Sequence, residues 1–198
     1  MVERPSSSRL GCAAFALAFG LTAPGAAFAA TDLLAALRPD RVFAQVGTGD
    51  DDTRMYIAGV TYDWRWTRPL WNGVVTGYWE SSFGRWNSDL SNGRRASAWI
   101  TQLGVTPVLR WSSSEAPSTW FAEAGIGANV LLPVYRSSDK SFSTAFNFGD
   151  HLAVGRTFGE DGRHELALRV QHFSNGGIKH PNPGENFVQL RYSWRFGR

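Results

Sequence analysis

The segment Val188-Gln-Leu-Arg-Tyr-Ser-Trp-Arg-Phe196 alternates strictly between apolar and polar side chains. Successive side chains of a β-strand point to opposite faces, so this pattern predicts a strand with one apolar and one polar face. Large aromatic residues occupy the end of the apolar face. Aromatic residues at the ends of apolar strand faces are typical of outer-membrane β-barrels, whose apolar face contacts lipid.

The same period of two recurs along the chain, and helical periodicity is nearly absent. The composition agrees, with 9 Trp, 13 Phe and 21 Gly among 198 residues. The pattern predicts an all-β protein, an eight-stranded antiparallel transmembrane β-barrel, because an even number of alternating segments of about 10 residues is the mark of that class. The expected strands cover residues 41–47, 54–66, 71–83, 96–111, 119–131, 142–158, 164–174 and 186–196.

A soluble β-sandwich or lipocalin-like barrel is the rival architecture, and it would bury the apolar faces inward. The polar faces argue against it, because they mix glycine with single charges and amides, which suits a narrow, filled lumen. Glu123 and His151 lie on these faces and are expected in an interior polar network. Short connections at 67–70, 112–118 and 159–163 predict the periplasmic side, and longer ones at 48–53, 84–95, 132–141 and 175–185 the extracellular side.

The N-terminal residues 1–29 have the features of a secretory signal peptide. Two arginines precede the apolar run Leu10 to Leu21, and Ala27-Phe28-Ala29 fits a cleavage site. Residues 30–198 are then a single outer-membrane barrel domain. The only cysteine lies inside the signal, so no disulfide is expected. A formal net charge of +3 does not indicate nucleic-acid binding.

His172 and Ser174 stand out on the apolar face of strand 164–174. They share that face with Leu166, Leu168 and Val170, because residues two apart in a strand point the same way. Polar groups on a lipid-facing surface are costly and indicate function. A histidine that takes the proton of a serine hydroxyl makes that hydroxyl a nucleophile, so the pair is a candidate ester-hydrolysing site.

The motif His172-Phe-Ser-Asn-Gly-Gly-Ile-Lys…Pro-Asn-Pro-Gly-Glu-Asn186, followed by an aromatic strand, resembles the C-terminal signature of the outer-membrane lipid A 3-O-deacylases, the PagL family. The resemblance implies an esterase that removes the acyl chain at the 3-position of lipid A, without metal or cofactor, and it allows a homodimer. It implies Ser174 as nucleophile, His172 as base and Asn175 in the oxyanion hole, with lipopolysaccharide as the membrane partner.

The third member of this triad has two candidates. Glu185 is the first choice, because a carboxylate both orients a catalytic imidazole and stabilises its charged form. In the family pattern the carboxylate comes one residue later, where this chain has Asn186. Strand parity places Asn186 on the face of Val188, and Glu185 reaches that face only through a bulge near Gly184. A non-enzymatic outer-membrane barrel, structural or adhesive, is the alternative function.

Overall fold

The computed structural model describes residues 38–90, 97–113, 119–159 and 161–196. They belong to one compact unit, Arg38–Arg198. The expected signal peptide, residues 1–29, lies outside the described residues, and so does residue 96, the first of the expected strand 96–111. No helix within the described ranges has the length and apolar character needed to cross a membrane.

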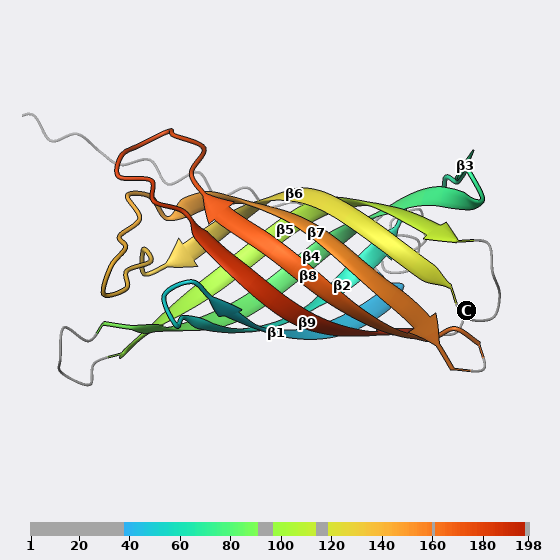
Figure 1. Cartoon of the computed structure of the whole chain (residues 1–198), viewed down its shortest axis with the longest axis horizontal. Helices are drawn as coiled ribbons and strands as arrows, with labels where there is room; N and C mark the ends of the chain where they lie inside the picture. Colours follow the sequence, from blue (N-terminus) through green and yellow to red (C-terminus); the bar gives the residue numbers. More distant parts are fainter. Residues whose placement is uncertain (1–37, 91–96, 114–118, 160, 197–198) are drawn as a thin grey trace, which may run out of the picture. The chain divides into compact units, whose positions relative to one another are not determined.

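Nine antiparallel strands form in the described part of the chain, and eight of them close a barrel (Figure 1). Their order is β2-β1-β9-β8-β7-β6-β5-β4, and the pairing of β2 with β4 completes the circle. The predicted eight-stranded antiparallel barrel is therefore confirmed. The strands are β1 Arg41–Gly49, β2 Arg54–Asp63, β3 Arg68–Leu70, β4 Gly73–Asp89, β5 Ser97–Ser113, β6 Trp120–Leu132, β7 Phe146–Phe158, β8 His164–Ser174 and β9 Glu185–Arg195.

Most strand ends lie within two residues of the sequence prediction, and three differ by more. β4 continues to Asp89, through residues expected in a loop, because it pairs with β5 along its whole length. β7 begins at Phe146 instead of residue 142. β2 ends at Asp63, and the expected turn 67–70 contains β3, which pairs with the start of β4 where β2 no longer reaches it.

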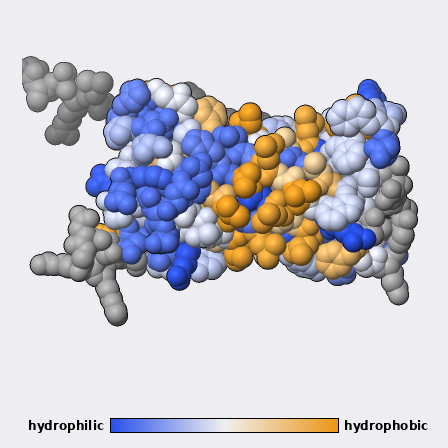
Figure 2. All heavy atoms as spheres, in the orientation of Figure 1, coloured by the Kyte–Doolittle hydropathy of each residue, from blue (hydrophilic) through white to orange (hydrophobic). Residues whose placement is uncertain are grey.

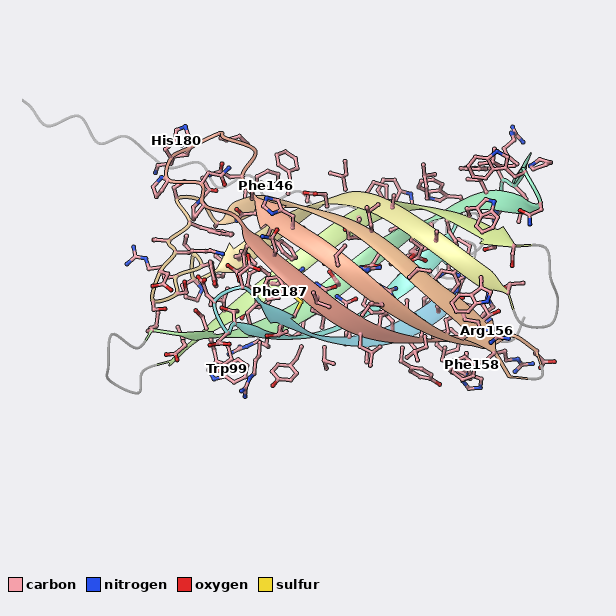
Figure 3. All side chains as sticks on the ribbon, viewed as in Figure 1. Trp99, Phe146, Arg156, Phe158, His180 and Phe187 are labelled. Atoms are coloured by element: carbon pink, nitrogen blue, oxygen red, sulfur yellow. The ribbon has the colours of Figure 1, made fainter. Side chains whose placement is uncertain are left out.

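The barrel presents its apolar side chains outward. Half or more of the side chain is exposed at outward positions such as Leu152, Leu168 and Val188. Figure 2 shows an apolar band between two more polar ends. Aromatic side chains project near both ends of the strands, Trp99 and Phe146 on the side of the longer loops and Phe158 on the other (Figure 3). This arrangement is the reverse of a soluble barrel, which buries its apolar face.

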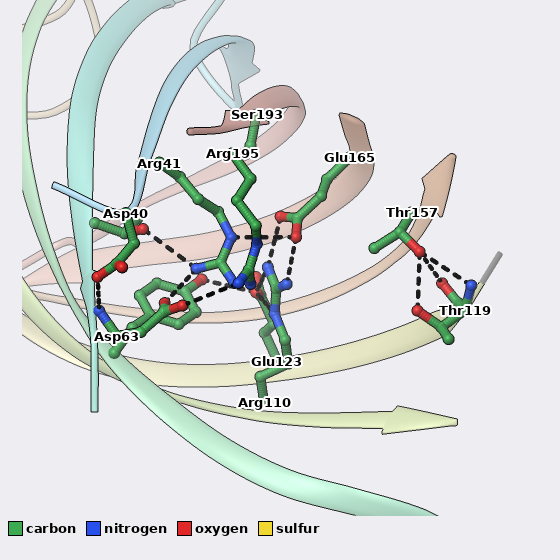
Figure 4. Close-up of polar contacts among 12 residues, drawn as sticks. Asp40, Arg41, Asp63, Arg110, Thr119, Glu123, Thr157, Glu165, Ser193 and Arg195 are labelled. Carbon is green, nitrogen blue, oxygen red and sulfur yellow. Dashed lines mark hydrogen bonds and ion pairs between the residues drawn. The ribbon is translucent and has the colours of Figure 1, made fainter. Parts of the chain in front are cut away.

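The lumen holds an apolar cluster that includes Trp86, Phe173 and Phe187, and it also holds a network of charged residues. Arg110 donates two hydrogen bonds to Glu165, at 2.7 and 2.9 Å, and a third to Glu123 at 2.7 Å (Figure 4). Arg169 forms a second bidentate pair with Glu80 at 3.1 Å. Glu123 and His151 are both 4% exposed within this interior, as the alternation predicted. The paired charges compensate one another where the side chains are buried.

Removal of one arginine from this network tests how far it stabilises the barrel. Arg110→Ala leaves the carboxylates of Glu123 and Glu165 buried beside the gap, so we expect a loss of about 3–5 kcal/mol in the free energy of unfolding. Arg163→Ala is the control, because Arg163 pairs with Asp161 at 2.9 Å on an exposed turn, where such pairs contribute about 0–1 kcal/mol. Urea unfolding of both variants in phospholipid vesicles, followed by tryptophan fluorescence, measures the difference. Equal losses would contradict a stabilising interior network.

Candidate active site

The predicted site residues meet where β8 and β9 end beside the longer loops. The register pairs His172 with Asn186 and Phe173 with Glu185. Paired residues share a face, so His172 and Asn186 point outward while Phe173 and Glu185 point into the lumen. Ser174 follows His172 on the same outward face, and both are half-buried. The alternation of β8 thus places serine and histidine on the apolar exterior, as predicted.

Asn186, and not Glu185, contacts the histidine. The distance from His172 Nδ1 to Asn186 Oδ1 is 2.7 Å. Glu185 is 0% exposed on the opposite face, where one carboxylate oxygen accepts a hydrogen bond from Lys140 Nζ at 2.9 Å. The β8–β9 register stays regular through Glu185, so no bulge turns its side chain outward. The geometry therefore favours the second candidate of the sequence analysis over the first.

Gly184 packs directly against the ring of His172. Its backbone has a φ of +70°, a conformation that side chains other than glycine rarely accept. A Cβ atom built at this position would lie 2.5 Å from His172 Cε1 and 3.1 Å from Nε2. Gly184 therefore lets the loop cover one side of the imidazole without displacing it.

Ser174 lies two residues from His172, and within the described ranges its hydroxyl forms no hydrogen bond to the imidazole. Catalytic hydrogen bonds are often long in a protein without substrate and tighten when substrate binds. Serine and histidine therefore share one outward face of β8, two residues apart.

Asn175 organises the turn that follows the serine. The residue is 1% exposed, and its side-chain Nδ2 donates to Lys179 O at 2.7 Å and to Ser143 Oγ at 3.0 Å. Its Oδ1 accepts from the backbone of Gly177 at 2.9 Å. The side chain is therefore fully committed to the loop. Gly176 is exposed at a φ of +64°, and its N–H has no hydrogen-bond acceptor among the described residues.

His172 and Asn186 line a groove on the side of the barrel. Its volume is about 930 Å³. Its lining extends from Trp64 and Pro107 to Asp50 and includes two rows of outward residues, each following the pairing of neighbouring strands. One row contains Ala124, Leu152, Val170 and Val188, and the other contains Ile126, Asp150, His172 and Asn186. The first row is wholly apolar, so the groove can hold a hydrocarbon chain beside the imidazole.

Asp150 is a site residue that the sequence analysis missed. It is the register partner of His172 on β7 and points to the same outward face. The signal was present in the sequence, because Asp150 interrupts an otherwise apolar face of Phe146, Phe148, Leu152 and Val154. A carboxylate on such a surface is costly and indicates function.

Substitution of Gly184 tests whether the loop positions the imidazole. Gly184→Ala forces the new Cβ into the ring, so we expect about 10- to 100-fold lower ester hydrolysis, since small misplacements of a catalytic group cost about this much. Gly162→Ala is the control, because Gly162 also has a left-handed φ, of +60°, but lies in the turn between β7 and β8 at the other end of the barrel. Initial rates of both purified variants measure the effect. A similar loss in both would point to backbone strain instead of the ring contact.

Comparison with known proteins places this geometry in context. The family model described as "Lipid A 3-O-deacylase (PagL)" matches residues 55–195. The lipid A deacylase PagL of Bordetella bronchiseptica is 36% identical over 137 residues, which cover 66% of this chain and 72% of the relative. The lipid A deacylase PagL of Pseudomonas aeruginosa is 29% identical over 154 residues, 76% of this chain and 83% of the relative.

A solved structure has the same architecture. The crystal structure of the outer membrane enzyme PagL superposes with a TM-score of 0.69 at 25% sequence identity. The superposition covers 79% of this chain and 99% of the other. The barrel and the order of its strands are therefore shared with an outer-membrane enzyme.

Proposed function

The chain belongs to the PagL family of lipid A 3-O-deacylases, and from this premise we propose that Ser174, His172 and Asn186 hydrolyse the 3-O-linked acyl ester of lipid A at the outer surface of the barrel. The family match makes the protein an outer-membrane enzyme that deacylates lipid A. One observation carries the assignment of residues: the 2.7 Å contact from Asn186 to His172, on the same outward face as Ser174. The non-enzymatic alternative is set aside, because the family is one of ester hydrolases.

The contact with Asn186 decides which ring nitrogen of His172 acts as the base. The N–H group at His172 Nδ1 donates a hydrogen bond to Asn186 Oδ1, which leaves Nε2 unprotonated and able to take the proton of the Ser174 hydroxyl. Ser174 Oγ then attacks the ester carbonyl, and the oxygen of the sugar leaves with the proton held by His172. The acyl group stays on Ser174 until water, activated by the same imidazole, releases it as a fatty acid.

The oxyanion of this reaction needs a fixed hydrogen-bond donor. We assign that role to the backbone N–H of Gly176, because the Asn175 side chain already donates within its loop. Asn175 then acts indirectly, by holding the turn that presents Gly176. This assignment differs from the direct role that the family resemblance implied for Asn175. One oxyanion-hole donor contributes about 2.7–4 kcal/mol to catalysis in other enzymes.

The surface around the site fits a substrate that is itself part of the membrane. The apolar band of the barrel would lie in the hydrocarbon region, and the longer loops would lie outside the cell. His172 then lies at the outer leaflet, where lipid A resides. The released acyl chain would occupy the groove along Leu152 and Val170, while the sugar and its phosphates stay at the level of the loops.

The mature protein is proposed to begin after Ala29, once residues 1–29 are removed as a signal peptide. Intact-mass measurement of the protein from outer membranes tests this cleavage site. A homodimer, which the family resemblance allows, stays a prediction that cross-linking in native membranes can check.

Mass spectrometry of lipid A tests the proposed activity. Cells that make hexa- or penta-acylated lipid A and express the protein should contain a species lacking one 3-hydroxyacyl chain at the 3-position. Cells expressing Ser174→Ala are the control and should retain the parent species. Unchanged lipid A with folded wild-type protein in the outer membrane would contradict the proposed function.

A further inference from the structure

Asn186 lacks two properties that a carboxylate would bring to the triad, a negative charge and two equivalent oxygen atoms. Asn186 is neutral, so it cannot balance the positive charge that His172 gains when it takes the serine proton. An amide also has two different ends, and only its oxygen can accept a hydrogen bond from the imidazole N–H. A productive site therefore needs something that fixes the amide orientation and something that supplies negative charge.

Asp50 meets both needs. It lies in the turn between β1 and β2, and its Oδ2 accepts a hydrogen bond from Asn186 Nδ2 at 2.7 Å. The backbone N–H of Asp50 also donates to the carbonyl of Asn186 at 3.2 Å. The contacts form one continuous line from carboxylate to amide to imidazole. An ionised carboxylate only accepts hydrogen bonds, so it holds the amide NH2 group toward itself and turns the amide oxygen toward His172.

We infer that Asp50 is a positioning residue of this active site, which fixes the amide of Asn186 and supplies, through it, the negative charge that the triad lacks. The inference rests on the proposed function of Ser174 and His172. It adds a carboxylate from a different hairpin, more than a hundred residues away in the sequence. The family pattern has a carboxylate at position 186. In this chain the carboxylate of Asp50 takes its place, and it is separated from His172 by the amide of Asn186.

Asp50 is ionised at neutral pH. The hydrogen bond from Asn186 holds the pKa of Asp50 below its usual range, and Lys140 acts in the same direction. Lys140 Nζ lies 3.3 Å from Asp50 Oδ2 and also binds Glu185 at 2.9 Å and Asp51 at 3.7 Å. Because this lysine is shared among three carboxylates, the group as a whole keeps a net negative charge.

A second charged group on the outward face beside His172 is Asp150, its register partner on β7. On β9 the partner is the neutral Asn186, and beyond it lie Asp50 and Lys140. Gly184 covers the ring from the preceding loop. Two carboxylates can therefore influence the protonation of the imidazole, and an experiment must separate them.

An exchange of amide and carboxylate gives the sharpest test. Asp50→Asn keeps the size and the ability to accept the hydrogen bond but removes the charge. Asn186→Asp, combined with it, restores the charge and the hydrogen bond in reversed order, with the carboxylate now directly against His172. Each variant is assayed as a purified barrel in detergent micelles, with lipid A as substrate, across a range of pH. Asp52→Asn is the control, because Asp52 is exposed two residues away at a φ of +53°, a conformation that asparagine accepts.

The expected results are specific to a charge that acts on the base. Asp50→Asn lowers kcat by about 10- to 100-fold with little change in KM, since indirect partners of catalytic groups contribute on that scale. The acidic limb of its pH–rate profile moves to lower pH, because an imidazole without a nearby negative charge protonates less readily. The double exchange returns kcat to within about threefold of wild type and moves the limb to higher pH. Asp52→Asn changes neither.

Two outcomes would overturn the inference. A role confined to holding the loop would leave Asp50→Asn near wild type, because the asparagine keeps the hydrogen bond, and the exchange would rescue nothing. A shifted pH profile in Asp150→Asn but not in Asp50→Asn would assign the charge to β7. Neither result resembles failure of the proposed function itself, which would appear as wild-type protein without activity or Ser174→Ala with full activity.

Discussion

Ser174→Ala is expected to lower deacylation by about 10⁴-fold or more while the barrel stays folded. The hydroxyl is the only proposed nucleophile, and removal of a triad serine leaves only the residual acceleration from binding and oxyanion stabilisation. His172→Ala should cause a loss of similar size, and the double variant should be little worse than either single one, because the residues act as a unit. Release of fatty acid from purified lipid A measures all three.

The fold of these variants needs its own control. Ser174 and His172 are half-buried at the outer surface, outside the charged interior, so their removal leaves the barrel network intact. The heat-dependent shift in electrophoretic mobility that folded barrels show in detergent should be unchanged. Near-normal turnover by folded Ser174→Ala would refute the nucleophile assignment.

Asn186→Ala is expected to lower turnover by about 10²- to 10⁴-fold, the second largest effect. Loss of the 2.7 Å contact frees the imidazole to rotate and to carry its proton on the wrong nitrogen. Glu185→Gln should lower turnover far less, by under about tenfold, because Glu185 binds Lys140 on the lumen side and does not face His172. Steady-state kinetics on lipid A rank the two variants.

The ranking distinguishes the two candidates of the sequence analysis. Glu185→Gln loses an ion pair that joins the start of β9 to the loop between β6 and β7, so its thermal stability should fall even where its kcat does not. A loss of kcat in Glu185→Gln that exceeds the loss in Asn186→Ala would restore Glu185 as the orienting residue. It would also remove the basis for the role of Asp50.

The barrel could be predicted from the sequence because apolar and polar side chains alternate along each strand, and this pattern depends only on neighbouring residues. In β6 the side chains of Ala122, Ala124, Ile126 and Ala128 lie outside, and the polar side chains of Glu123 and Asn129 lie inside, as the alternation of polarity predicts. The positions where strands begin and end were predicted less accurately. β4 continues to Asp89 because β5 offers backbone partners along its entire length, and a partner strand leaves no mark in the local sequence. The small strand β3 forms for a similar reason, at the exposed end of β4.

The active site was predictable only in part. His172 and Ser174 follow from parity on one strand, and parity also favours Asn186. The choice of Glu185 gives weight to charge over register, whereas the regular pairing of β8 with β9 favours Asn186. The role of Asp50 could not be predicted from the sequence. Its contact with Asn186 depends on the pairing of β1 with β9, the first and last strands of the barrel.

Covalent labelling of the serine tests the central claim most directly. A long-chain alkyl fluorophosphonate reacts with an activated serine, and its apolar chain fits the outward groove beside His172. Mass spectrometry of the labelled barrel should show one adduct per chain, on the peptide that contains Ser174, formed far more slowly in His172→Ala and in Asn186→Ala. An adduct on a different residue, or an active protein that the reagent neither labels nor inhibits, would contradict a serine nucleophile on the lipid-facing surface.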